Sequence, residues 1–421
     1  MTTYPSTTVS SLNGLFKNRY GDGVVDAIPR QSILQKLIPF DGSKQLGASF
    51  NFPVVLAQEG GVTFGGTAGN AFNLNAAIPM TTQNAQIVSG EVVVRGILSV
   101  GAASRALNEG PAAFESATAL QMENMIESHS KVREIEMLYG ASTTGLSQGS
   151  VASVNSTTVT FTPGAGQWSY LWVGTTNRNI DCYSGATLLN TNGPVVVSKV
   201  NVVAKTLTLT AAAADITAIL AATAGTVTLF WYLAYGNENL GIEAIAANTT
   251  ATQFTISAAT WDLWQGNTYA VGGDLSFSNV GDFLSVLQGR GLEEDIELYV
   301  SPKTWRFFND ANVSYRKLDS SYTTKVTQVG AASVEYESHT GTLSVVAHQY
   351  VKEGFAYLVC SDRFHRIGSS DITFNRPGGE EGRFFRDLEN QNGFEYRTYS
   401  DFAIINERPS TCGVMTGITN V

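Results

Sequence analysis

The sequence is poor in the residues that most metal and redox sites require. Of its 421 residues only 15% are charged, whereas soluble domains average about 25%. Its four histidines never share the helical spacing that places two metal ligands on one face. Its three cysteines, Cys182, Cys360 and Cys412, are odd in number and far apart, so we expect reduced, buried thiols. A metalloenzyme and a disulfide-stabilised secreted domain are therefore both disfavoured.

Long apolar runs and an excess of basic residues are also absent. The longest candidate run, residues 211–222, is interrupted by Asp215 and Thr217, so no membrane span is expected. The first residues lack the basic and apolar segments of a secretion signal, and we expect a soluble protein made in a cytoplasm. The net charge of −10 disfavours a basic DNA-binding face but is compatible with a wall that encloses DNA. With so few charged residues, the surface either contacts other protein or consists largely of Thr, Ser and Asn.

The first hundred residues form two segments that cannot bury their own apolar side chains. Residues 1–44 predict an extended N-terminal arm, punctuated by turn pairs such as Asn13-Gly14 and containing one short helix over 30–37. Residues 45–100 predict an extended β-hairpin loop with strands at 50–56 and 91–95 and a flexible glycine-rich tip at 59–69. Both segments need a neighbouring molecule to cover them.

Residues 101–147 contain the strongest helix signal, between Pro111 and Gly140. Met125, His129 and Tyr139 belong to a stripe at three- and four-residue steps, which predicts one buried face. The charged residues are expected on the remaining faces: Glu115, Glu123, Glu127, Lys131, Arg133, Glu134 and Glu136.

Residues 148–272 differ from the rest because Thr, Val and Ala alternate and only eight charges occur. This pattern predicts an inserted all-β, sandwich-like domain. Residues 273–378 return to a mixed pattern, with a helix near 280–287, a buried strand at 297–300 and a helix capped by Ser301 before Pro302. Residues 379–421 are mainly strands, and the fold class as a whole is α+β.

Motifs for chemistry are weak. Gly145-Leu-Ser-Gln-Gly149 matches the nucleophile elbow of hydrolases, a motif that needs a strand before the serine and a helix after it. Here a helix precedes Ser147 and β-alternation follows it. This reversed order favours a linker. The glycine-rich stretch 60–69 lacks the Lys-Ser/Thr pair of a phosphate loop. The segment 362–366, which mixes basic and aromatic residues, fits an ordinary alternating strand better than a nucleic-acid contact. We expect no catalytic residue, no metal and no cofactor.

The order of these elements is more informative than any motif. The chain has, in order, an arm, a glycine-tipped β-loop, a long helix ending Glu134-Ile-Glu-Met-Leu-Tyr-Gly140, a later α/β domain and a final strand before Glu407-Arg-Pro409. This order resembles that of the major capsid proteins of tailed bacteriophages, whose fold is shared with encapsulin shells. The resemblance covers about 1–147 and 273–421. It implies that the helix is the spine of a peripheral domain, that 273–378 is an axial domain, and that 379–421 returns to the peripheral strands.

The resemblance implies a structural protein, not an enzyme, that self-assembles into hexamers and pentamers of an icosahedral capsid enclosing double-stranded DNA. Its partners would be copies of itself, a separate scaffolding protein, a portal and a decoration protein, with assembly in the host cytoplasm. The alternatives are an enzyme-filled compartment shell, another virion component such as a tail tube, a surface adhesin built on β-modules, and a serine hydrolase acting through Ser147. The residues expected to contact neighbouring subunits are Leu15, Phe16, Phe50, Phe52, Glu59, Phe64, Glu115, Glu123 and Arg133.

Overall fold

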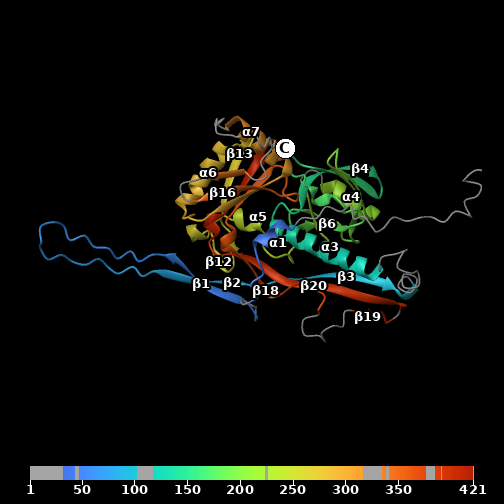
Figure 1. The fold of residues 1–421 in the computed structure, drawn as a ribbon, viewed down its shortest axis with the longest axis horizontal. Helices are drawn as coiled ribbons and strands as arrows, with labels where there is room; N and C mark the ends of the chain where they lie inside the picture. The colour runs from blue at the N-terminus through green and yellow to red at the C-terminus, as the bar shows by residue number, and fades with distance from the viewer. Residues whose placement is uncertain are drawn as a thin grey trace, which may run out of the picture.

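The protein is built from a long helix, two sheets, a β-barrel and a projecting two-stranded ribbon (Figure 1). The computed structural model describes residues 32–42, 47–101, 117–222, 226–315, 334–337, 341–375, 385–389 and 391–420. The expected α+β class is confirmed.

The spine helix, α3 (Ala117–Tyr139), lies along a sheet that we call the spine sheet. Its central strand β20 (Gly393–Asn406) pairs with β3 (Glu91–Ser99) on one side and β18 (Phe364–Thr373) on the other, and the short β19 (Arg386–Asp387) pairs with its beginning. Because side chains alternate along a strand, Tyr396, Thr398 and Ser400 face α3. Their neighbours point to the opposite face.

A six-stranded sheet forms the second body of the fold. Its strand order is β13 (Asn267–Gly273), β21 (Gly413–Ile418), β17 (Phe355–Val359), β14 (Ile296–Val300), β16 (Thr342–Ala347) and β15 (Val334–Glu337). Helices α6 (Phe277–Gly289) and α7 (Pro302–Tyr315) follow the predicted positions, and the Ser301 hydroxyl caps α7 by accepting from the Thr304 amide. Leu298 packs in the core that contains α6 and α7, whereas Tyr299 packs in the larger core on the other face, near α5 (Ile242–Ala246).

Sheet membership differs from the expected domain boundaries. Strand β18 lies within the range 273–378 but pairs with β20 of the spine sheet, and β21 lies within 379–421 but joins the six-stranded sheet. Strand β13 likewise belongs to this sheet although it falls inside the expected insertion. The chain thus crosses between the two sheets twice after residue 360. No local sequence pattern indicates which of the two sheets each of these strands joins.

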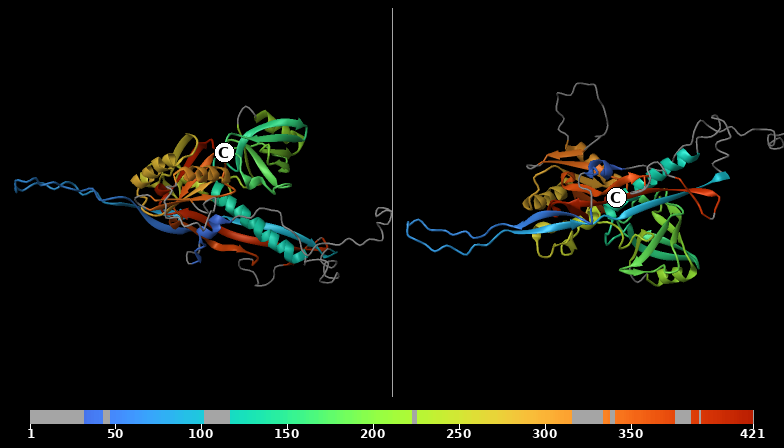
Figure 2. Two further views of the ribbon diagram at one scale, coloured as in Figure 1. Left: turned by 45° about the horizontal axis from the view of Figure 1, so that its top comes forward. Right: turned by 90° about the horizontal axis from the view of Figure 1, so that it is seen from below.

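The inserted region forms a closed barrel where two packed sheets were expected. Strands β4 (Ser147–Asn155), β5 (Thr158–Pro163), β9 (Thr206–Thr210), β8 (Val195–Asn201), β6 (Asn179–Ser184) and β10 (Val227–Trp231) pair in that order, and β10 pairs back to β4. Strand β7 (Thr187–Leu188) extends β6, and α4 (Ala213–Ala221) packs against the barrel. Because the barrel is closed, β4 and β10 pair with each other and are not left as exposed edge strands. Figure 2 shows the barrel beside the spine helix.

The barrel ends earlier than residue 272. The chain from 232 onward includes α5, the small hairpin β11 (Thr252–Gln253) and β12 (Ile256–Ser257), and a turn at Asp262–Trp264. The hairpin and the turn pack against the root of the ribbon, where Trp264 contacts Phe52 and the Gln86 amide donates to the Phe254 carbonyl, whereas α5 packs against α3 and β17. They connect the ribbon to the body and are not part of the barrel.

The ribbon pairs differently from expectation. Strand β1 (Phe50–Ala57) pairs with β2 (Thr81–Ile87), and the predicted partner at 91–95 instead belongs to β3 of the spine sheet. Strand β2 has the polar sequence Thr-Thr-Gln-Asn-Ala-Gln-Ile, which carries almost no alternating apolar signal. Hence its pairing could not be recognised from the sequence.

Candidate assembly surfaces

The ribbon projects beyond the body as a loop of residues 58–80 (Figure 1). Its two arms stay paired past the end of the strands, because the Gly60 amide donates to the Ile78 carbonyl and Asn75 bonds to Val62 and Thr63. We call residues 58–80 the ribbon loop.

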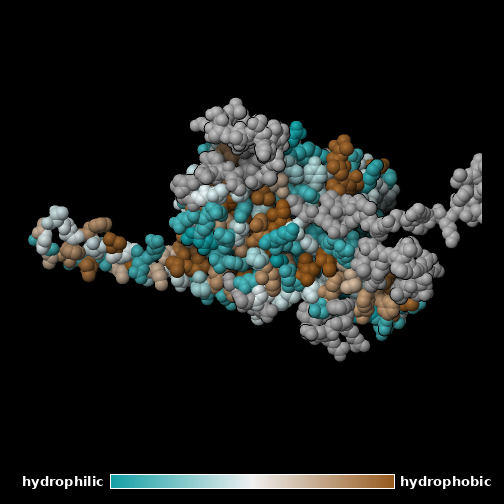
Figure 3. All heavy atoms as spheres, viewed as in Figure 1, coloured by the Kyte–Doolittle hydropathy of each residue, from teal (hydrophilic) through white to brown (hydrophobic). Residues whose placement is uncertain are grey.

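Large apolar side chains stand in solvent along the ribbon loop. Phe64 is 90% exposed and Leu74 is 81% exposed, and smaller exposures occur at Val62, Phe72, Ile78 and Met80. Figure 3 shows these apolar residues spread along the projection. Glu59 is the one charged residue in the sequence between Phe50 and Ile87. Covering such a surface removes much apolar area from water at little cost in charge desolvation.

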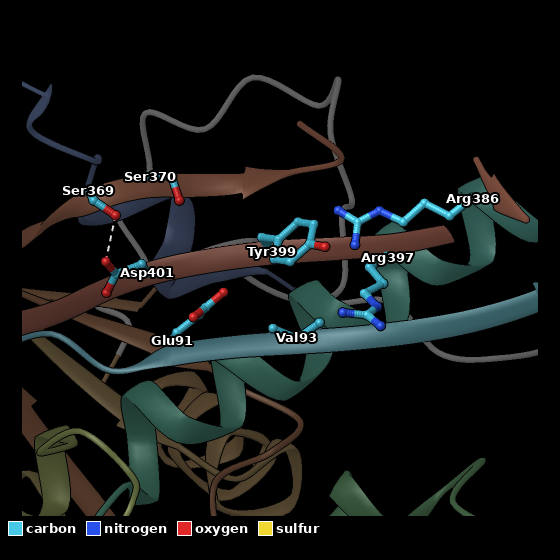
Figure 4. A pocket seen from close by; sticks show the side chains of 8 residues that line it. All are labelled: Glu91, Val93, Ser369, Ser370, Arg386, Arg397, Tyr399 and Asp401. Carbon is cyan, nitrogen blue, oxygen red and sulfur yellow. Dashed lines mark hydrogen bonds between the residues drawn. The ribbon is translucent and has the colours of Figure 1, made fainter. Parts of the chain in front are cut away.

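The spine sheet offers a second surface, on the side turned away from α3. We call it the open face. Strand β3 contributes Glu91, Val93, Arg95 and Ile97, and β20 contributes Glu395, Arg397, Tyr399 and Asp401. A pocket of about 500 Å³ lies there, lined by residues of both strands and by Ser369, Ser370 and Arg386. Figure 4 shows Arg386 and Arg397 on one side of Tyr399 and Glu91 and Asp401 on the other.

Charge is unevenly distributed over the open face. Arg95 donates to Glu395 at 2.7 Å and Arg397 donates to the other oxygen of the same carboxylate. These hydrogen bonds hold the pKa of Glu395 below its usual value and raise the pKa of Arg397. Because one carboxylate pairs with two guanidinium groups and Arg386 lies nearby, this part of the face carries excess positive charge. Val93 and Ile97, both nearly half exposed, lie beside it.

The charged residues near the end of α3 lie inside the molecule, which corrects the prediction of a one-sided helix. Arg133 and Glu134 are 1% and 0% exposed, and Glu136 is also buried. Arg133 pairs with Glu136 at 2.5 Å, donates to the Phe402 carbonyl and stacks on the Phe402 ring. The C-terminal half of α3 is surrounded by other elements of the chain. Its charges are therefore paired internally.

His129, predicted on the buried stripe, lies between α3 and β20. Its two ring nitrogens bond to the hydroxyls of Thr398 and Ser400 at 2.8 and 2.7 Å. Burial, followed by the charge of Arg133, lowers the pKa of His129 to about 4. The histidine is therefore neutral near pH 7 and acts as a packing residue.

A second buried ion pair lies where the spine helix, the barrel and the six-stranded sheet meet. The Lys352 ammonium donates to Thr144 and to the Gly145 carbonyl at 2.6 and 2.7 Å and lies 3.6 Å from Glu243. Glu243 also accepts from the hydroxyl of Tyr357 at 2.5 Å. Burial lowers the pKa of Lys352 and raises the pKa of Tyr357. The hydrogen bonds satisfy both charges, which gives this junction a structural role.

The predicted contact residues have different positions in the structure. Glu59, Phe64 and Glu123 are exposed. Phe50 and Phe52 are half-buried against their own chain, and Arg133 is buried, so no neighbouring molecule can reach its guanidinium in this fold. Leu15, Phe16 and Glu115 lie outside the described residues.

Sequence reasoning missed Leu74 on the ribbon loop and the arginines of the open face. The alternation of charged residues at 395 and 397 could have indicated one face of a strand. The pairing of β3 with β20, which brings Arg95 beside them, has no local signal.

The structure gives no support for catalysis at Ser147. The serine begins β4, is fully buried, and donates to the Gln167 carbonyl at 3.1 Å. It lies in neither a linker nor a strand-to-helix turn. Among the described residues no three His, Cys, Asp or Glu side chains cluster as metal ligands, and no helix there has the length and apolar character needed to cross a bilayer.

Comparisons with solved structures show where this arrangement occurs. The chain is similar to the capsid asymmetric unit of cyanophage A-1(L), with a TM-score of 0.59 and 12% identity, over 98% of this chain and 100% of that chain. It is also similar to the capsid of an empty GTA particle, with a TM-score of 0.51 and 8% identity, over 98% and 99% of the two chains. No protein-family model matches the sequence, and no curated protein is similar to it. The chain therefore has the fold of tailed-phage major capsid proteins.

Proposed function

We propose that this protein is the major capsid protein of a tailed bacteriophage. It self-assembles into hexamers and pentamers of an icosahedral shell that encloses double-stranded DNA. The observation that carries the proposal is the ribbon loop: a shell-type fold presents a projecting, nearly uncharged segment with Phe64 and Leu74 in solvent. Large exposed apolar surfaces mark interaction sites in soluble proteins.

Repetition explains how modest contacts hold a shell. Burial of a Phe or Leu side chain contributes about 1.5–3 kcal/mol. Each copy both gives a ribbon loop and receives one, so contacts multiply around a closed assembly and bind by avidity. A scaffolding protein, a portal and a decoration protein complete the proposed partners.

The open face is the surface that we propose receives the ribbon loop of a neighbouring copy. The part of it around Glu395 combines half-exposed apolar residues with more arginines than acids, and the ribbon loop combines apolar residues with the single acid Glu59. In this contact Glu59 lies near Arg386, which makes no ion pair within the described part of the chain. Charge complementarity then fixes the register of the contact more than its strength.

Two substitutions test the apolar part of the contact. In the variant Phe64→Ser with Leu74→Ser, we expect an unchanged melting temperature and a loss of shells and capsomers in electron micrographs. Val203→Ser is the matched control, since Val203 is 96% exposed but lies at a barrel turn. Normal shells from the ribbon-loop variant would contradict the proposal.

Charge exchange tests the pairing. Glu59→Arg and Arg386→Glu should each reduce assembly, and the combined variant should restore it. Failure of the combined variant, with both single variants folded, would rule out this register. DNA inside the particles would support a virus capsid, whereas an enzyme cargo would indicate a compartment shell.

A further inference from the structure

The first described element, α1 (Ile33–Leu37), has only five residues, and the body holds it at both ends. So short a helix is unstable by itself in water. Leu34 and Ile38 are almost fully buried in the main core. Hydrogen bonds join this segment to α3 and β18, both far away in sequence. The helix is thus bound to the body like a docked peptide.

At its beginning, α1 meets a carboxylate. Glu134 of the spine helix accepts from the Leu34 amide through Oε1 at 2.7 Å and from the Gln35 amide through Oε2 at 3.1 Å. First-turn amides of a helix have no partner within the helix, and the partial positive charge there favours an anion. One buried carboxylate therefore satisfies two of these donors.

A histidine orients that carboxylate. The Nδ1 atom of His348 accepts from the Tyr350 amide at 3.2 Å, so the ring hydrogen is on Nε2. Nε2 donates to Oε1 of Glu134 at 3.1 Å. Both side chains are fully buried. The neutral histidine suffices for this bond.

At its end, α1 meets a guanidinium. Arg366 of β18 donates through Nε to the Ile38 carbonyl at 2.5 Å and through Nη2 to the Gln35 carbonyl at 3.2 Å. Asp371 and the ring of Phe402 fix this side chain. Carbonyls in the last turn of a helix carry partial negative charge, which favours a cation.

We propose that Glu134 and Arg366 form a two-ended latch that fixes the root of the N-terminal arm on its own body and opens as one unit. Between the two ends there are too few residues for either half to remain helical alone. Releasing one end therefore releases the other. The latch is a property of the single chain; its consequence, a defined starting position for the arm in assembly, rests on the proposed function.

Hydrogen exchange on the full-length, unassembled chain tests the latch. In the unaltered protein the amides of Leu34, Gln35 and Ile38 should exchange through one opening, with the same free energy and the same denaturant dependence. Different opening energies at the two ends would overturn the proposal. This measurement requires no variant, so it stays decisive if a variant does not fold.

Variants then test the coupling between the ends. Glu134→Gln should accelerate exchange at Ile38, and Arg366→Gln should accelerate exchange at Leu34, each by about tenfold or more, since bonds to charged groups are lost. In the double variant the two losses lower one shared opening free energy, so exchange at Leu34 and at Ile38 should accelerate equally and by more than in either single variant. Glu123→Gln, on an exposed part of the same helix, should change nothing. Acceleration confined to the altered end, or spread through α3, would contradict a latch.

Discussion

At the scale of single residues, the charges of the spine helix show how far a local pattern can mislead. A helical pattern assigns charged residues to solvent when apolar residues occupy one face. In this chain Arg133, Glu134 and Glu136 are buried because other parts of the chain surround the end of α3. The apolar stripe was predicted correctly at Met125 and Tyr139. The partners of these charged residues, such as Phe402 and His348, are more than 200 residues away in the chain, so a local sequence pattern cannot predict these contacts.

Arg133 should therefore affect folding and not the contact between copies. Arg133→Met removes one half of a buried ion pair and leaves Glu136 without that partner. We expect a loss of about 3–5 kcal/mol in the free energy of unfolding. Urea denaturation monitored by tryptophan fluorescence measures it. A variant with unchanged stability but defective assembly would contradict the internal role.

Glu238 should make stability depend on pH. Burial, reinforced by the charge of Glu136, raises the pKa of Glu238 to about 7. The folded chain thus holds this proton more tightly than the unfolded chain, whose glutamates titrate near a pKa of about 4.3. The stabilisation is complete below that pH and is lost as the pH rises to about 7.

Glu238→Gln removes this titration while its side-chain oxygen can still accept from the Ala141 amide. We expect the variant to be more stable by about 1–3 kcal/mol above pH 7 and equal to the original protein near pH 4. Unfolding curves between pH 4 and 8 test this. Parallel pH profiles for the two proteins would contradict the raised pKa.

At the scale of elements, strand alternation and helix caps were predictable, whereas pairing was not. The strand at 297–300 and the Ser301 cap follow from local sequence. The closure of the barrel through β10 depends on contacts between strands about 45 and 80 residues apart in the chain. The polar strand β2 is defined mainly by the partner beside it.

The barrel is attached to the six-stranded sheet by a close backbone contact. The Gly354 amide donates to the Gly166 carbonyl at 2.8 Å, and a Cβ added at Gly354 would lie 2.6 Å from the Gly166 Cα. Glu353, beside it, pairs with Lys205 of the barrel. The two glycines therefore permit an approach that side chains would prevent.

Gly354→Ala should loosen this attachment at a cost of about 1–3 kcal/mol, as in overpacked cores. Exchange at the Glu353 and Gly354 amides should accelerate while the barrel strands stay protected. The control is Gly281→Ala in α6, where the added methyl meets open space and helix propensity favours alanine by about 1 kcal/mol. Equal effects of the two substitutions would refute the close-contact explanation.

At the scale of the whole molecule, the order of elements along the sequence predicted the fold. The resemblance to tailed-phage capsid proteins is confirmed in fold. Phe64 on the ribbon loop is 90% exposed, so this early segment leaves an apolar side chain uncovered by its own chain, and its contact with a neighbour stays a prediction. At Phe50 and Phe52 the chain covers its own residues in part, because Trp264 returns to the root of the ribbon. Which outer residues contact a second copy depends on a surface outside the single chain.

Sedimentation of the purified chain, followed by electron microscopy, tests the central claim most directly. The unaltered protein should sediment as capsomers or larger particles and appear as closed shells. The variant with serine at positions 64 and 74 should sediment as a folded monomer under the same conditions. A monomer from the unaltered protein at every salt and protein concentration, even with the proposed scaffolding protein added, would contradict assembly through the ribbon loop.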